Sequence, residues 1–142
     1  MENKKEESKA GDNEADFKKF IRENTDLNLK GKKSFTGENT YISVDEYFEY
    51  NGKKVYVEID SGNMAKLIAG QYILLNILGE FDKDSMFLVI HYYANYNYQR
   101  TKNVLECVNK NALDNKGIKF IALHINQFKK LVKAGNLKTV IK

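Results

Sequence analysis

Three acidic residues have the type and spacing to bind a cation. Asp45 lies in the segment 41–50, and Glu58 and Asp60 lie in the segment 53–60. Both segments are rich in Tyr, Val, Ile and Phe, which is typical of β-strands. The chemistry of the three side chains therefore depends on how these two strands pair.

The dipeptide between the two segments fixes their register. Asn51-Gly52 tolerates positive φ at both central positions of a tight turn, so it predicts a two-residue hairpin. In that register Asp45 lies directly opposite Glu58, and Asp60 lies two residues further along the same face of the sheet. The hairpin thus predicts that the three carboxylates converge.

Carboxylates that converge on a half-buried face repel one another unless a cation or a proton neutralises them. Oxygen ligands of this kind suit Mg²⁺, which keeps several of its waters. Glu46 falls on the opposite face and is left out of this group. The alternative is that the acids lie on an exposed strand face and bind no cation.

The rest of the chain predicts an α/β fold. Apolar spacing and turn signals indicate a helix, then strands, then alternating helices and strands, with a parallel crossover between two buried strands. The expected elements are helix 14–24, a short strand near 33–36, the hairpin, helix 64–78 buried on nearly all sides, strand 86–93, helix 99–113, strand 118–125 and helix 126–134.

Composition narrows the class of protein. The chain has 142 residues and a formal charge of +4, but residues 115–142 hold seven Lys and no acid. Residues 1–13 predict a disordered leader, and residues 14–142 predict a single domain. A single Cys excludes a disulfide framework, and no Gly-rich phosphate-binding motif is present. With no secretory signal and no apolar run long enough to span a membrane, we expect a cytoplasmic protein.

The segment VDEYFEYNGKKVYVEIDSGN, residues 44–63, resembles the core of the PD-(D/E)xK restriction-endonuclease-like nuclease superfamily. The resemblance spans roughly residues 14–125 and implies an αβββαβ core with a mixed sheet flanked by helices. It implies that Asp45, Glu58 and Asp60 bind catalytic Mg²⁺ or Mn²⁺. Asp60 stands where the family usually has Lys.

Because Asp60 replaces the Lys that the family usually has, neighbouring side chains are candidates for the role of that Lys and for accessory roles. Lys66, in the first turn of the following helix, is a candidate substitute for the missing Lys, or an ordinary solvated Lys. Gln71 resembles a polar residue often present on that helix in the family, or is a buried, hydrogen-bonded amide. Glu14 matches the family's first-helix acid, or is a Glu favoured by the helix dipole.

The resemblance implies a metal-dependent endonuclease that hydrolyses DNA phosphodiester bonds, in the manner of a restriction enzyme or a junction resolvase. Cleavage of both strands of a duplex needs two active sites, so a homodimer is implied. The side chains expected to contact the phosphate backbone are Arg100, Lys129, Lys130 and Lys133.

Two other functions remain open at this point. A catalytically degenerate relative would use the same fold to bind DNA or protein. A small structural or interaction protein would use its tyrosines, such as Tyr92 and Tyr93, as a partner surface. His91 and His124 lie on predicted buried strands without metal-ligand spacing, which favours core packing.

Overall fold

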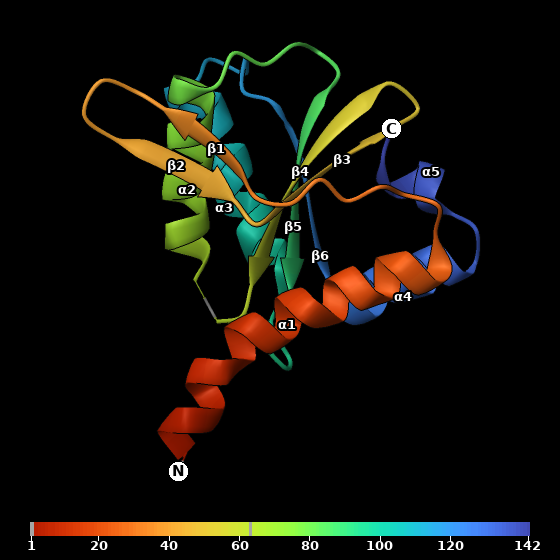
Figure 1. Cartoon of the computed structure of the whole chain (residues 1–142). Helices are drawn as coiled ribbons and strands as arrows, with labels where there is room; N and C mark the ends of the chain where they lie inside the picture. The colour runs from red at the N-terminus through yellow and green to blue at the C-terminus, as the bar shows by residue number, and fades with distance from the viewer. Residues whose placement is uncertain (1, 63) are drawn as a thin grey trace.

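A mixed four-stranded sheet organises the molecule, with helices on both of its faces (Figure 1). The computed structural model describes residues 2–62 and 64–142, and their side chains from residue 11 onward. The predicted α/β class, a mixed sheet flanked by helices, is confirmed.

The sheet has the order β3-β4-β5-β6. The strands β3 and β4 are antiparallel, and β5 and β6 continue parallel to β4. The predicted hairpin turn is confirmed, because Tyr50 pairs with Lys53 and both turn residues have positive φ. The bounds are Glu46–Tyr50 for β3, Lys53–Asp60 for β4, Ser85–His91 for β5 and Lys119–His124 for β6.

The first strand of the predicted hairpin is divided at Asp45. Residues before it form β2, Tyr41–Val44, which pairs with β1, Lys33–Thr36, in a separate two-stranded sheet. The expectation of one continuous strand over 41–50 is therefore wrong. The break lets one run of β-forming residues serve two sheets.

Helices cover both faces of the main sheet. The helices α2, Ala65–Leu78, and α3, Tyr98–Ala112, pack on one face, over a core that includes Tyr56 and Phe87. The other face is covered by α1, Glu2–Asn24, α4, Ile125–Lys133, and α5, Leu137–Val140. None of the helices in the described part of the chain is long and apolar enough to cross a membrane.

Helix α1 begins earlier than the sequence predicts. The segment 1–13 is expected to be disordered, but α1 starts at Glu2 and its first turns extend past the sheet (Figure 1). Glu and Lys are the commonest of these residues, and both favour helix. Strong local propensity thus accounts for the difference.

Helix α2 is less buried than its apolar sequence predicts. The residues Ala65, Ile68, Tyr72 and Leu75 are buried on one side. The opposite side is open to solvent, where Leu67 is 65% exposed. The expectation of a helix buried on nearly all sides is therefore wrong, because the sheet covers only one side of α2.

Candidate carboxylate site

The carboxyl ends of β4 and β5 place Asp60 next to His91. The two residues are paired in the parallel register. His91 Nδ1 lies 2.8 Å from Asp60 Oδ2, and the His91 side chain is fully buried. Asp60 Oδ1 also accepts a hydrogen bond from the Gly62 N–H. Asp60 is thus directed toward a buried imidazole.

Asp45 reaches the same end of the sheet from the break between β2 and β3. Its N–H donates to the Val57 carbonyl at 2.9 Å. Its Oδ2 accepts from the Ile59 N–H at 2.8 Å, so the side chain lies across the backbone of β4 on either side of Glu58. Asp45 and Glu58 therefore lie together as predicted, although Asp45 stands outside the β3–β4 ladder.

Glu58 is the most perturbed acid of the site. Its pKa is raised to about 9, most of all by burial and then by the charge of Asp45, a hydrogen bond to Asp45 and the charge of Asp60. Its Oε1 atom is shut off from solvent and has no hydrogen-bond partner among the described residues. An unpartnered, buried carboxylate oxygen of this kind is costly without a proton or a cation.

Glu14 joins the site from α1. Burial raises its pKa, and the charge of Asp45 and a hydrogen bond to Asp45 raise it too. Asn13, the residue before it, donates to Ser61 Oγ at 2.9 Å and so ties α1 to the loop after β4. The structure therefore brings Glu14 next to Asp45 and Glu58, with Asp60 close enough for its charge to act on Glu58.

The donor set fits a hard divalent cation in its chemistry. All members are carboxylates, and Glu58 Oε1 lacks a partner within the described part of the chain. Among the side chains of residues 11–62 and 64–142, no three His, Cys, Asp or Glu groups already surround one point as metal ligands do. Mg²⁺ is commonly held by only one or two carboxylates, with water and phosphate oxygens as its other ligands, so the pair Asp45–Glu58 meets this requirement.

A pocket of about 420 Å³ opens beside the acids. Glu58, Asp60 and Gln71 are among the side chains that line it. Gln71 donates through Nε2 to the Ser43 carbonyl at 2.6 Å, so it ties α2 to β2. Lys66 is exposed and is not part of the pocket lining.

Two lysines that the sequence analysis did not single out are electrostatically coupled to the site. The charges of Lys18 and Lys32 act on Glu14 and lower its pKa, against the larger effects of burial and Asp45. Lys18 lies one helical turn after Glu14, a spacing that can be read from the sequence. Lys32 comes from the loop before β1, which only the fold brings near.

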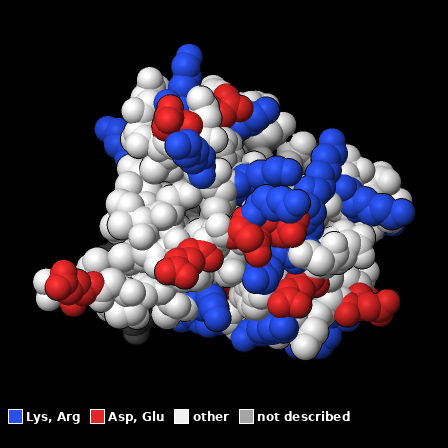
Figure 2. Space-filling view, turned by 90° about the horizontal axis from the view of Figure 1, so that it is seen from above, with Lys and Arg blue, Asp and Glu red and all other residues white. Residues whose placement is uncertain are grey.

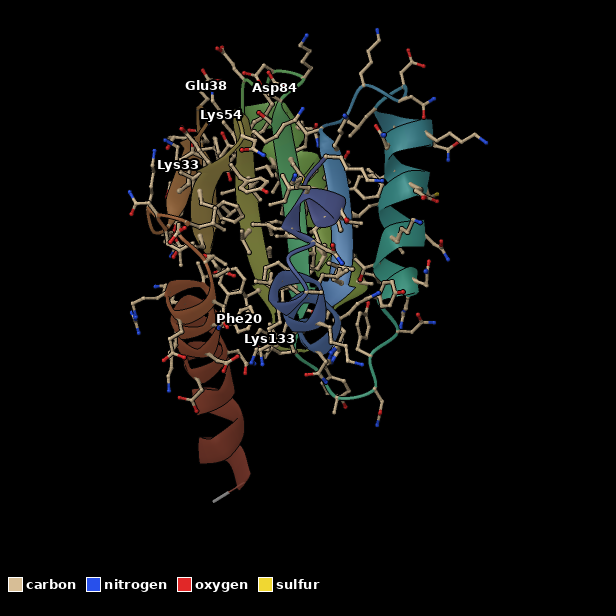
Figure 3. All side chains as sticks on the ribbon, turned by 90° about the vertical axis from the view of Figure 1, so that its right-hand side faces the viewer. Phe20, Lys33, Glu38, Lys54, Asp84 and Lys133 are labelled. Atoms are coloured by element: carbon tan, nitrogen blue, oxygen red, sulfur yellow. The ribbon has the colours of Figure 1, made fainter. Side chains whose placement is uncertain are left out.

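The predicted phosphate-binding residues have different surroundings. Lys129 Nζ lies 2.9 Å from Asp16 Oδ2, and Lys133 Nζ lies 6.0 Å from the centroid of the Phe20 ring (Figure 3). Both therefore help to dock α4 on α1. The other two, Arg100 and Lys130, are exposed.

The contact between Lys129 and Asp16 is strengthened by Tyr92. Burial alone would raise the pKa of Asp16, but hydrogen bonds from Lys129 and from the Tyr92 hydroxyl outweigh it and lower that pKa. The contact holds Lys129 at 30% side-chain exposure. Lys129 thus stabilises the packing of α4 on α1, a role that its place in a Lys-rich segment does not indicate.

Comparison with protein-family models and with curated proteins gives no match. Among solved structures, the chain resembles the crystal structure of AF1548, a protein of unknown function. The TM-score is 0.43 and the sequence identity is 14%, over 77% of this chain. The matched region spans 55% of the AF1548 chain, so the likeness covers about half of that protein.

Proposed function

We propose that the chain is a metal-dependent endonuclease that hydrolyses DNA phosphodiester bonds. The observation that carries the proposal is the adjacent, half-buried pair Asp45–Glu58, in which the buried Glu58 Oε1 atom has no partner among the described residues. Such a pair is suited to bind Mg²⁺ or Mn²⁺ together with a phosphate oxygen.

Each acid has a distinct role in this proposal. Asp45 and Glu58 would hold the metal, Glu14 would hold a water molecule next to them by a hydrogen bond, and Asp60 orients the end of β4 through His91. A metal bound there supplies an activated water and neutralises charge that develops on the phosphate. In the reaction, water adds to phosphorus, the bond from phosphorus to one sugar oxygen breaks, and that oxygen takes up a proton.

The chain's own cations complete the proposed site. Lys18 and Lys32, whose charges act on Glu14, join Lys66, in the first turn of α2, as the lysines proposed to stabilise a phosphate next to the acids. The exposed Arg100 and Lys130 extend the contact to the DNA backbone. A homodimer would supply the second active site needed to cut both strands of a duplex.

A cleavage assay tests this proposal. The wild-type chain should nick or cut plasmid, branched or single-stranded DNA only when Mg²⁺ or Mn²⁺ is present. Asp45→Asn and Glu58→Gln should lower the rate by roughly 100-fold or more, since each removes a charged metal ligand. Lys83→Ala, which alters an exposed side chain in the loop before β5, at the opposite end of the sheet from the acids, is the matched control and should retain activity.

A second candidate function is a binding module of the same fold without catalysis. The observation that favours it is the Asp60–His91 pair, which occupies the position where the resembled family has its Lys. In this case DNA or protein binding would persist without cleavage. Binding of labelled DNA with no product, in the presence of either metal, would support this candidate over the endonuclease.

A further inference from the structure

Helix α2 presents a row of large apolar side chains to solvent. Leu67 and Ile77 are each 65% exposed, Met64 at the N-cap is 48% exposed and Leu74 is 37% exposed. Their spacing of three, seven and three residues places them along one side of the helix. Tyr41 of β2, which packs against α2, is 70% exposed. We name this surface the α2 apolar face; it comprises Tyr41, Met64, Leu67, Leu74 and Ile77.

Gly70 lies at the centre of this face. Helical spacing puts it between Leu67 and Leu74, and a Cβ atom added at Gly70 would meet nothing within 4 Å. The backbone of α2 is therefore accessible at this point. A second helix could approach closely here, because the distance between packed helices depends on the side chains at their contact.

The charge distribution argues for a second copy of the chain as the partner. In a twofold contact the same patch meets itself, so a charge near the axis would face its own copy, whereas an uncharged patch is complementary to itself. The only charged residue of α2 is Lys66, at its first turn. Figure 2 shows an uncharged, white area in the middle of the left side, with Asp and Glu below it and charged residues of both signs above it, and Lys and Arg gathered mostly on the right. A nucleic acid or a charged peptide would find no complementary group on this face.

The α2 apolar face also adjoins the carboxylate site. Met64 and Leu67 line the same pocket as Glu58 and Asp60. A second copy on this face would therefore cover the side of the pocket and bring two carboxylate sites near the twofold axis. We propose that the chain forms a twofold homodimer through the α2 apolar face, with the two α2 helices crossing at Gly70. This deepens the proposed function, by naming where the second copy binds.

Sedimentation velocity of the full chain, without metal or DNA, tests the dimer separately from catalysis. The expected species has twice the 16.4 kDa mass of the chain. Leu67→Glu and Ile77→Glu should each raise the dissociation constant about 30-fold or more, as expected for central interface residues. Tyr93→Glu, which alters a side chain 51% exposed outside the α2 apolar face, is the matched control and should leave the dimer intact.

Gly70→Leu tests the crossing point. The new side chain has free space in the single chain, so the fold should be kept, and circular dichroism checks this. The Gly70→Leu change should weaken the dimer if two helices cross at Gly70, whereas a surface that associates only by nonspecific apolar contact would associate more strongly.

A monomer at all concentrations, or a dimer unchanged by Leu67→Glu, would overturn the interface. A dimer as tight with Gly70→Leu would overturn the crossing. Loss of the dimer would leave the cleavage assay unaffected as a test of the carboxylate site.

Discussion

Two enclosed glutamates on the β3–β4 hairpin, Glu46 and Glu58, have opposite surroundings. Glu46 faces the core under α1 and is 1% exposed. Its carboxylate accepts hydrogen bonds from the N–H groups of Gly31 and Tyr47, and Lys18 Nζ lies 3.9 Å from it. Glu58 faces α2, lies against Asp45, and has an oxygen without a partner among the described residues.

The difference separates a carboxylate that serves the fold from one that serves a ligand. Backbone N–H groups and a lysine compensate for the desolvation of Glu46, as is usual for buried charges. Glu58 has acids for neighbours, so the protein itself supplies little compensation. A cation is the partner that its environment lacks. Glu46 is fully buried and Glu58 is half-buried, but the hydrogen-bond partners are what distinguish the two sites in function.

The largest expected effect comes from breaking the Glu46 site. Glu46→Ala leaves the N–H groups of Gly31 and Tyr47 without their acceptor and removes the partner of Lys18. We expect the free energy of unfolding to fall by about 3 kcal/mol. Urea denaturation followed by circular dichroism measures it. A change below about 0.5 kcal/mol would mean that these hydrogen bonds do not hold the loop before β1.

Glu58→Gln should have the opposite sign. Without metal, near pH 8, it removes a carboxyl whose pKa is raised to about 9 by burial and by Asp45, so we expect a gain of about 1–3 kcal/mol in the free energy of unfolding. The matched change Glu46→Gln should lose about 1 kcal/mol. Equal losses in both variants would contradict the distinction between the two sites.

The pH dependence sharpens the comparison. The pKa of Glu58 is about 9 in the folded chain, against 4.5 as its ordinary value. A carboxyl with a raised folded pKa contributes most to stability below the unfolded pKa, and this contribution is lost as pH rises through the folded pKa. The gain from Glu58→Gln should therefore shrink steadily between pH 8 and pH 5 in thermal melts without metal. A gain that stays constant over this range would show that the pKa of Glu58 is not raised in the folded chain.

Much of the fold follows from local sequence signals. Asn51-Gly52 predicts the hairpin and its register, and the all-apolar run in β5 predicts a strand covered on both faces. The site depends on more distant contacts. The Asp60–His91 pair joins residues 31 positions apart through the parallel register of β4 and β5, which the sequence does not specify residue by residue.

The sequence predictions that the structure contradicts were wrong for physical reasons as well. The strand break at Asp45 arises because β2 pairs with β1, a competing partner that hairpin rules do not include. The exposure of Leu67 and Ile77 cannot be read from an apolar helix, because composition does not say how many sides are covered. Both differences lie next to the carboxylate site, where local rules are most often overridden.

Thermal melts with and without Mg²⁺ or Mn²⁺ test the central claim, that the Asp45–Glu58 pair binds a divalent cation, most directly. At a metal concentration 100 times the dissociation constant, wild-type protein should gain about 2.7 kcal/mol, a gain that should grow from pH 6 to pH 8 as protons compete less with the metal. Glu46→Gln should keep this response and Glu58→Gln should lose it. A melting temperature that no metal changes, or an equal response in Glu58→Gln, would contradict the account.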